Sequence, residues 1–433
     1  MSRRLRPPLA RTPLHLAHPR PHPAPLRLPR TLGAPMRIGE LFAGYGGLGM
    51  GVKAVLGGEV VWVSEIESGP RKVLAHRYPD APNLGDITAV DWSQVEPVDV
   101  LTGGFPCQDV STAGKRAGLR PGTRSGLWQH MAYAVDQLRP GLVLIENVRG
   151  LLSAEAHSDV EPCPWCVGDD ADGALRALGA VLGDLADLGY DAVWCGLRAA
   201  DVGAAHGRFR VFVAAFPADG HEWGRSARGW GTGSADGRLL PTPTSRDHKG
   251  RNQRNDTTCL TGALLPTPAV NDMGAGKTPG EWDEWTDAMK ARHGNGNGNG
   301  PSLNIEVQRL LPTPGVADST GGHHSRSGER SDELLLKGIA HHEQFGDYAD
   351  AIARHEHAFG HSAPDPTEPA PRGGRRLSCH FDEWLMGLPS GWITDTPDVT
   401  HNETLRMCGN GVVPAQAAAA LAWCLSQIEA GAA

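Results

Sequence analysis

The sequence predicts an α/β protein built on a mostly parallel, doubly wound sheet with helices on both faces. Between Arg37 and Pro217, apolar runs of strand length alternate with helix-like stretches, the pattern of a parallel sheet covered on both sides. The first apolar run ends in a glycine-rich turn, and cysteine, acidic and arginine residues stand at the ends of later runs. Ligands of open α/β sheets bind beyond the carboxyl ends of the strands, so these residues are candidates for a site.

The elements follow in chain order. Five strands are expected, at residues 37–44, 59–66, 98–104, 141–148 and 208–216. Helices are expected at 69–78 and 174–189, and an alanine-rich helix at 413–431 has Pro414 in its first turn, where a missing N–H is harmless. No apolar run approaches about 18 residues, so we expect no membrane-spanning segment and no membrane partner.

Composition limits the class of protein. The 433 residues are 40% apolar and 21% charged, which is typical of a globular protein. The net charge of -8 gives no overall attraction to nucleic acid, so any DNA contact must come from local basic patches. The eight cysteines are scattered along a chain too long to need a disulfide framework, which indicates a reducing, cytoplasmic environment.

The glycine turn spans residues 40–51, ELFAGYGGLGMG, and contains the spacing G-x-G-x-x-G. That spacing alone is a weak signal in a chain with 56 glycines. Glu65 follows the second strand and could accept both hydroxyls of a ribose, and Asp86 could accept from the exocyclic amine of an adenine. These placements fit any adenosine-bearing cofactor and do not separate NAD from S-adenosylmethionine.

Three further motifs carry candidate chemistry. In GGFPCQDVS, residues 103–111, the glycines and proline form a turn that would present the thiol of Cys107, although a free cysteine is more often a buried apolar residue. In IENVRG, residues 145–150, Glu146 closes an apolar strand and is either solvated or partly buried, and burial would raise its pKa. Arg208 and Arg210 share one strand face, where they either bind an anion or remain exposed.

Three regions lie outside this pattern. Residues 1–35 hold many prolines and arginines and no acidic residue, which predicts disorder, with Met36 as an alternative translation start. Residues 218–376 are rich in Gly, Pro, Asn and Thr and repeat the phrase LLPTP at 239–243, 264–268 and 310–314, as a surface linker or as functional loops. Cys163 and Cys166 form a lone C-x-x-C without an upstream H-x-E, so we predict no metal site and no zinc deaminase.

Taken in order, these motifs resemble the DNA (cytosine-5) methyltransferase family. The resemblance covers about residues 36–217 and 377–425 and includes ELFAGYGGLGMG, GGFPCQDVS, ENVRG, HGRFRVF, LSCHFDEWLMGLP and GNGVVPAQ. It implies a Rossmann-like S-adenosylmethionine-dependent methyltransferase fold with a small, irregular target-recognition domain. Catalytic residues 36–217 plus 377–433 would flank recognition residues 218–376, where four basic residues in RDHKGRNQRN, 246–255, suit DNA backbone contact.

The resemblance also assigns site residues. The catalytic set is Cys107, Glu146, Arg208 and Arg210. The cofactor set, for S-adenosylmethionine, is Phe42, Gly44, Gly46, Leu48, Glu65, Ile66, Asp86, Ile87, Pro106 and Asn410. The expected substrate is double-stranded DNA with one cytosine flipped out of the helix. We expect a monomer, with or without a cognate restriction endonuclease.

The sequence departs from the family pattern in two places. The family's Gln-Arg-Arg-x-Arg appears as His206-Gly207-Arg208-Phe209-Arg210, and the late block 380–389 lacks the family's usual charges, so we expect packing to replace them. The alternatives are a nicotinamide-dependent dehydrogenase using the same glycines and a non-catalytic DNA-binding relative. The DNA sequence that is recognised does not follow from these motifs.

Overall fold

A computed structural model describes most of the expected α/β region and much of the C-terminal half. The described residues are 35–105, 127–152, 155–156, 175–218, 277–293, 302, 305, 308–319, 324–325, 334–341, 348–371 and 373–431. Pro106, Cys107, the Cys163/Cys166 pair, residues 1–34 and the first two LLPTP phrases lie outside these ranges.

The centre of the molecule is a six-stranded sheet in the order β2-β1-β3-β4-β8-β7. Its strands are β1 (Arg37–Leu41), β2 (Glu59–Ser64), β3 (Val100–Gly103), β4 (Leu142–Val148), β7 (Tyr190–Arg198) and β8 (Phe209–Pro217). The neighbours among β1 to β4 pair in parallel, whereas β8 is antiparallel to both β4 and β7. The mostly parallel sheet predicted from the sequence is confirmed.

Strand β7 was not among the expected strands. It forms one edge of the sheet, and its burial alternates only weakly because much of its length is partly exposed. It is joined to β8 through the short 3-10 helix η5 (Ala199–Val202). A connection this short lacks the helical crossover that a parallel pair needs, so β8 returns antiparallel.

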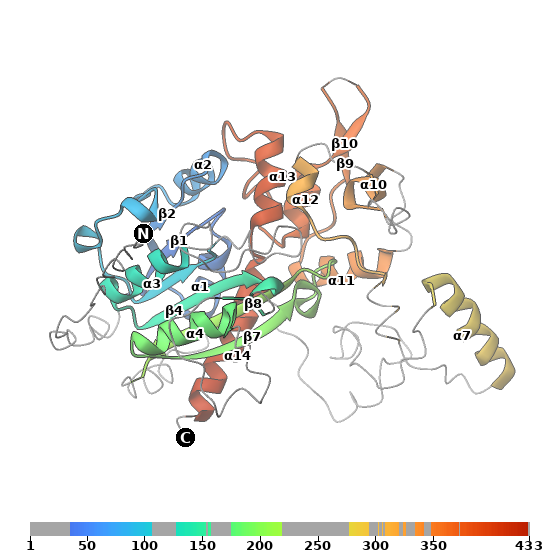
Figure 1. Cartoon of the computed structure of the whole chain (residues 1–433). Helices are drawn as coiled ribbons and strands as arrows, with labels where there is room; N and C mark the ends of the chain where they lie inside the picture. The colour runs from blue at the N-terminus through green and yellow to red at the C-terminus, as the bar shows by residue number, and fades with distance from the viewer. Residues whose placement is uncertain are drawn as a thin grey trace, which may run out of the picture.

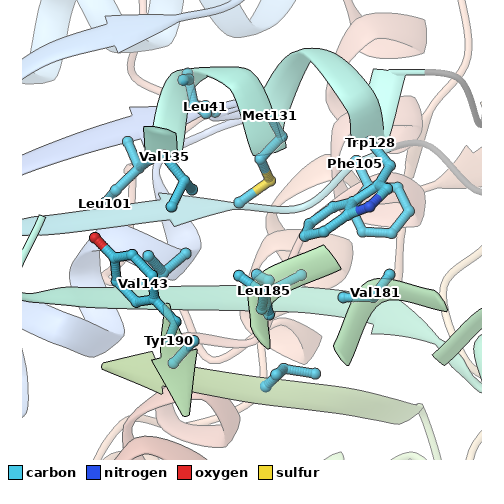
Figure 2. Packing of buried hydrophobic residues seen from close by; sticks show 14 of the residues in the cluster. Leu41, Leu101, Phe105, Trp128, Met131, Val135, Val143, Val181, Leu185 and Tyr190 are labelled. Atoms are coloured by element: carbon cyan, nitrogen blue, oxygen red, sulfur yellow. The ribbon is translucent and has the colours of Figure 1, made fainter. Parts of the chain in front are cut away.

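Helices cover both faces of the sheet (Figure 1). One face packs against α1 (Gly47–Leu56) and α14 (Pro414–Gly431), with Val52, Ala417 and Leu421 in a core cluster. The other face packs against α3 (Leu127–Leu138) and α4 (Ala177–Asp187). Figure 2 shows Trp128 and Met131 of α3 over this second face. The expected helices at 69–78, 174–189 and 413–431 correspond to α2 (Ser68–Arg77), α4 and α14.

A second group of elements packs beside the sheet. It comprises α9 (Val316–Ser319), α10 (Leu336–His341), α11 (Ala349–Phe359), the β9 (Thr367–Pro369) and β10 (Arg375–Leu377) hairpin, α12 (Cys379–Leu385) and α13 (His401–Asn410). Helix α7 (Pro279–His293) lies to the side of this group (Figure 1). One core cluster joins Leu311 and Ile339 to Phe381 and Leu385, and thus includes residues from both sides of position 377. The domain division there stays a prediction.

One described stretch, His401–Ile428, has the length and mean hydropathy of a membrane-crossing helix. It is not one continuous helix, because α13 ends at Asn410 and α14 begins at Pro414. Leu421 and Cys424 of α14 are fully buried in the cluster against the sheet. This is the packing of a core helix in a globular domain.

Candidate active site

The carboxyl ends of the parallel strands carry the candidate site. The loop of residues 42–46 follows β1, Glu65 follows β2, Gly104 follows β3, and Glu146 lies near the end of β4. Because β8 runs in the opposite direction, its first residues reach the same edge, and Val148 of β4 pairs with Arg210. The fold therefore gathers at one edge residues that are far apart in the sequence.

The loop after β1 has a backbone shape that requires glycine. Gly44 and Gly46 have φ angles of +55° and +90°, in the left-handed region that glycine adopts readily. Phe42 also has a positive φ, of +51°, which marks a locally strained turn. A side chain at Gly44 would meet nothing within 4 Å, whereas one at Gly46 would lie 3.0 Å from the ring of Tyr78. The loop is thus open to a ligand at Gly44.

Glu65 connects the ends of β1 and β2 through backbone hydrogen bonds. Its Oε2 accepts from the N–H of Gly44 at 2.9 Å, and its Oε1 accepts from the N–H groups of Ile66 and Glu67 at 2.8 Å. A carboxylate offers about four acceptor positions, so one remains, on Oε2. Glu65 therefore has capacity for a further donor on Oε2, and its binding of ribose hydroxyls stays a prediction. Burial raises the pKa of Glu65 above its usual value.

The remaining residues predicted near an adenosine differ in exposure. The Ile66 side chain is 65% exposed beside Glu65, and Asp86 is exposed and caps a 3-10 helix through the N–H and hydroxyl of Thr88. Those Thr88 hydrogen bonds lower the pKa of Asp86, which keeps it ionised. The side chains of Leu48 and Ile87 instead lie in the two core clusters. That these two residues contact the cofactor therefore stays a prediction.

Glu40 is a buried carboxyl that the sequence analysis missed. It lies in β1 below the glycine loop with 1% exposure, and its Oε1 accepts from the N–H of Gly49 at 3.0 Å. Burial raises the pKa of Glu40 to about 8, so the group is largely protonated at neutral pH. An acidic residue inside the apolar run RIGEL was the available signal.

At the β4 end of the edge, Glu146 and Arg210 form a buried ion pair. The Glu146 Oε1 lies 2.6 Å from the Arg210 Nε, and both side chains are at most 13% exposed. Burial raises the pKa of Glu146 above its usual value despite the opposing charges of Arg210 and Arg208. A side chain at Gly104 would come within 3.1 Å of Glu146 Oε2, so glycine leaves room for this carboxyl.

Asn147 joins the ends of β3 and β4. Its side-chain amide donates to the backbone carbonyl of Phe105 at 3.2 Å, and Asn147 itself is 2% exposed. The ends of β3 and β4 are therefore held together beside Glu146. Cys107 follows Phe105 by two residues in the sequence and lies outside the described residues.

Arg208 makes contacts that differ from the predicted ones. Its guanidinium donates to the carbonyls of Gly409 at 3.1 Å and Gly411 at 2.6 Å, and more weakly to that of Pro314 at 3.4 Å. Burial and the charge of Arg210 lower the pKa of Arg208 to about 9, so it remains charged at neutral pH. These donors are engaged with backbone, which makes Arg208 a link between β8 and the block around Asn410, itself exposed at the end of α13.

The sequence model of the C-5 cytosine-specific DNA methylase family matches residues 36–424. The chain belongs to this family.

Individual relatives match over shorter stretches. The type II methyltransferase M.NgoBV of Neisseria gonorrhoeae is 32% identical over 179 residues, which are 40% of this chain and 40% of that protein. M.Eco47II of Escherichia coli is 41% identical over 124 residues, 28% of this chain and 29% of its own length. A protein of Escherichia phage P1 named DNA N-6-adenine-methyltransferase is 38% identical over 128 residues, 25% of this chain and 17% of its length.

Among solved structures, the Dnmt2 methyltransferase of S. pombe superposes with a TM-score of 0.48 and 14% identity, covering 91% of this chain and 99% of that one. The chain spans about two fifths of the length of M.NgoBV, the first of the type II relatives named above.

In this methylase, the third LLPTP phrase is anchored rather than exposed. Leu310 and Leu311 are buried in the cluster with α10 and α12, and the N–H of Leu311 donates to the carbonyl of Ala205 at 2.9 Å. A side chain at Gly409 would lie 2.4 Å from the backbone of Val316, so two backbones meet closely there. For this copy, docking on the β7–β8 connection replaces the expectation of a surface linker.

The late block keeps one charge that the sequence analysis did not use. Glu383 is 2% exposed, and its carboxylate accepts from the N–H groups of Gly391 at 2.7 Å, Ile393 at 2.6 Å and Thr394 at 2.9 Å. Packing alone was expected here, whereas the structure combines packing with a buried, fully engaged carboxylate.

Within the described residues, one group could hold a metal ion: Glu368, Cys379 and His401. Each already has a protein partner. Glu368 pairs with Arg376 at 2.6 Å, the Cys379 thiol lies 3.7 Å from the carbonyl of His401, and the His401 Nε2 lies 2.9 Å from the carbonyl of Leu377. Burial raises the pKa of the Cys379 thiol to about 12, which disfavours the thiolate that a metal needs.

Proposed function

We propose that this methylase transfers a methyl group from S-adenosylmethionine to carbon 5 of a cytosine that is flipped out of double-stranded DNA. The observation that carries the proposal is the buried Glu146–Arg210 pair. Gly104 leaves room for the Glu146 carboxyl, and the neighbouring Asn147 holds the carbonyl of Phe105, two residues before Cys107 in the sequence. Membership of the C-5 cytosine-specific family supports carbon 5 as the position of transfer.

The residues at the β1 and β2 ends fit an adenosine-bearing methyl donor. Gly44 is open, Ile66 offers an exposed apolar surface, and the Oε2 of Glu65 has acceptor capacity for one ribose hydroxyl. Asp86 could accept from an adenine amine on the same side. S-adenosylmethionine, when bound, supplies an electrophilic methyl group.

The residues at the β3 and β4 ends would activate the cytosine. The thiolate of Cys107 adds to carbon 6 of the ring, and a proton held by Glu146 at ring nitrogen 3 neutralises the charge that develops. Burial already favours the protonated form of Glu146, because it raises the pKa of that carboxyl. Arg210 fixes the carboxyl in place. Carbon 5 would take the methyl group with S-adenosylhomocysteine as the leaving group. The proton on carbon 5 would pass to a base, and elimination of the Cys107 thiolate would restore the ring.

The wider assignments belong to the same proposal. Residues 218–376 would form the target-recognition region, and the protein would act in the cytoplasm as a monomer. Its relatives include enzymes named type II methyltransferases, which supports a restriction-modification context.

A duplex containing 5-fluorocytosine tests the reaction directly, because fluorine cannot leave as a proton does and the enzyme stays bound to the base. We expect a covalent complex that needs both S-adenosylmethionine and Cys107. The variant Cys107→Ala should lose both the complex and methyl transfer while still binding S-adenosylmethionine, and Cys195→Ala, on the edge strand β7, should behave as wild type.

Analysis of the methylated nucleosides completes the test. We expect 5-methylcytosine as the product. Methyl groups found on adenine, or full transfer by Cys107→Ala, would refute the proposal. Binding of NADH in competition with S-adenosylmethionine would favour the dehydrogenase alternative instead.

A further inference from the structure

Trp392 lies between α12 and α13 and contacts the loop after β1, although no motif singled it out. Its indole N–H donates to the backbone carbonyl of Tyr45 at 2.9 Å. Its ring meets the ring of Tyr78 edge-on, with centroids 6.1 Å apart. The same Tyr78 ring is the group against which Gly46 packs. Trp392 therefore contacts both the loop and the side chain that supports it.

Trp392 is itself firmly held. The N–H groups of Gly391 and Ile393, on either side of it, both donate to the buried carboxylate of Glu383. Arg77 approaches from α2, donating to the carbonyl of Trp392 at 2.8 Å while its guanidinium lies 5.1 Å from the centre of the indole ring. Contacts from two helices thus fix both the backbone and the ring of this residue.

Tyr45 is the point at which these contacts reach the loop. It is 1% exposed, and its hydroxyl donates to the carbonyl of Val412 at 2.8 Å. With its own carbonyl held by Trp392, Tyr45 is fastened at both the side chain and the backbone. It lies between Gly44 and Gly46, whose positive φ values define the loop, so fixing the Tyr45 carbonyl fixes the orientation of the peptide that joins it to Gly46.

We propose that Trp392 is a positioning residue for the methyl-donor loop, acting through the carbonyl of Tyr45. The inference rests on the proposed function, because it assumes that this loop binds S-adenosylmethionine. Trp392 sets the affinity for the donor and leaves the chemical step on the cytosine, which belongs to Glu146 and Cys107, unchanged. It also connects α12, through Glu383, with the donor pocket.

The variant Trp392→Phe removes the indole N–H and keeps an aromatic ring beside Tyr78. A hydrogen bond of this kind contributes about 1 kcal/mol, so we expect about 5-fold weaker binding of tritiated S-adenosylmethionine without DNA. At saturating donor, kcat should stay within about 2-fold of wild type. A residue that only stabilised the fold would not separate donor affinity from kcat in this way.

The matched control is Trp384→Phe. The Trp384 indole also donates to a backbone carbonyl, that of His361 at 3.2 Å, but among the described residues its hydrogen bond and ring contacts go to His361, His355 and Phe381 and not to the loop. We expect its donor affinity to equal that of wild type. Equal weakening in both variants, or wild-type affinity in Trp392→Phe, would overturn the proposal.

A second variant, Arg77→Met, decides the matter if Trp392→Phe does not fold. It removes the support of Trp392 from α2 and leaves the indole in place, so a smaller loss of donor affinity is expected, and unchanged affinity would refute the inference. Failure of the wild-type protein to bind S-adenosylmethionine would instead refute the proposed function. The two failures are therefore distinguishable.

Discussion

The two halves of the sheet edge are built differently. At the β1 and β2 ends, backbone N–H groups and glycines with positive φ surround Glu65, and Ile66 is exposed. At the β4 and β8 ends, charged side chains are buried against each other, as in the Glu146–Arg210 pair. The first arrangement suits a ligand that brings hydroxyls and an apolar ring, and the second suits control of a proton.

This difference predicts that substitutions in the two halves change different kinetic constants. Those near Glu146 should change the rate of the chemical step, and those near Glu65 should change donor affinity. The following experiments test that separation, from the largest expected effect to the smallest.

The largest effect is expected for Glu146→Gln. The amide keeps the shape of the carboxyl but cannot deliver a proton, so kcat should fall about 10²- to 10⁴-fold while the KM for S-adenosylmethionine stays unchanged. Steady-state methylation of duplex DNA measures both constants. The control Glu96→Gln changes an exposed carboxylate paired with Arg37, and it should leave both constants alone. A near-normal kcat for Glu146→Gln would remove the acid role.

A second effect concerns pH and the buried Glu40. Its pKa is about 8 in the folded chain against 4.5 for the free group. Between those values the unfolded chain releases a proton that the folded chain retains, so stability falls as pH rises through this window, by a few kcal/mol. Glu40→Gln, a mimic of the protonated form, should lose this dependence.

Urea unfolding at pH 5 and pH 8 measures the difference for both proteins. We expect wild type to lose more stability than Glu40→Gln between the two pH values. Parallel losses would mean that Glu40 is already ionised in the folded protein. In that case the β1 and β2 ends would contain a buried charge, as the β4 and β8 ends do.

The smallest effect is expected for Glu65→Gln. Loss of one charge-assisted acceptor should weaken S-adenosylmethionine binding about 10-fold and leave kcat at saturating donor nearly unchanged. Equilibrium dialysis gives the affinity. Glu67→Gln alters a neighbouring carboxylate that pairs with Arg406 on the surface, and its affinity should match wild type. A large fall in kcat for Glu65→Gln would contradict the separation of the two halves.

Much of the fold followed from local patterns. The buried runs that became β1 to β4 and β8 are short and apolar, and Pro414 begins α14 as expected. The edge strand β7 was missed because its partial exposure leaves no clear period-two pattern in YDAVWCGLR. Local periodicity also cannot give the direction of a strand, which for β8 depends on the length of its connection.

The candidate site was predictable in its residue types but not in all its contacts. Glu146 and Arg210 could be named from motifs, whereas the attachment of Arg208 to Gly409 and Gly411 joins segments about 200 residues apart. The indole of Trp392 donates to the carbonyl of Tyr45 over a still longer separation, of 347 positions. Pairings over this distance leave no local pattern to read, and so they require the structure.

The hydrogen bond from Tyr45 to Val412 joins residues 367 positions apart. Gly51 of α1 likewise has no room for a side chain because Ala417 of α14 lies against it. During synthesis, the loop after β1 therefore emerges from the ribosome long before Val412 and Ala417, which pack against it and against α1. A chain that ends before Val412 would retain β1 and its glycines but would lack the residues that pack against Tyr45 and α1. Binding of the methyl donor would then indicate that the C-terminal part of the chain has been made and folded.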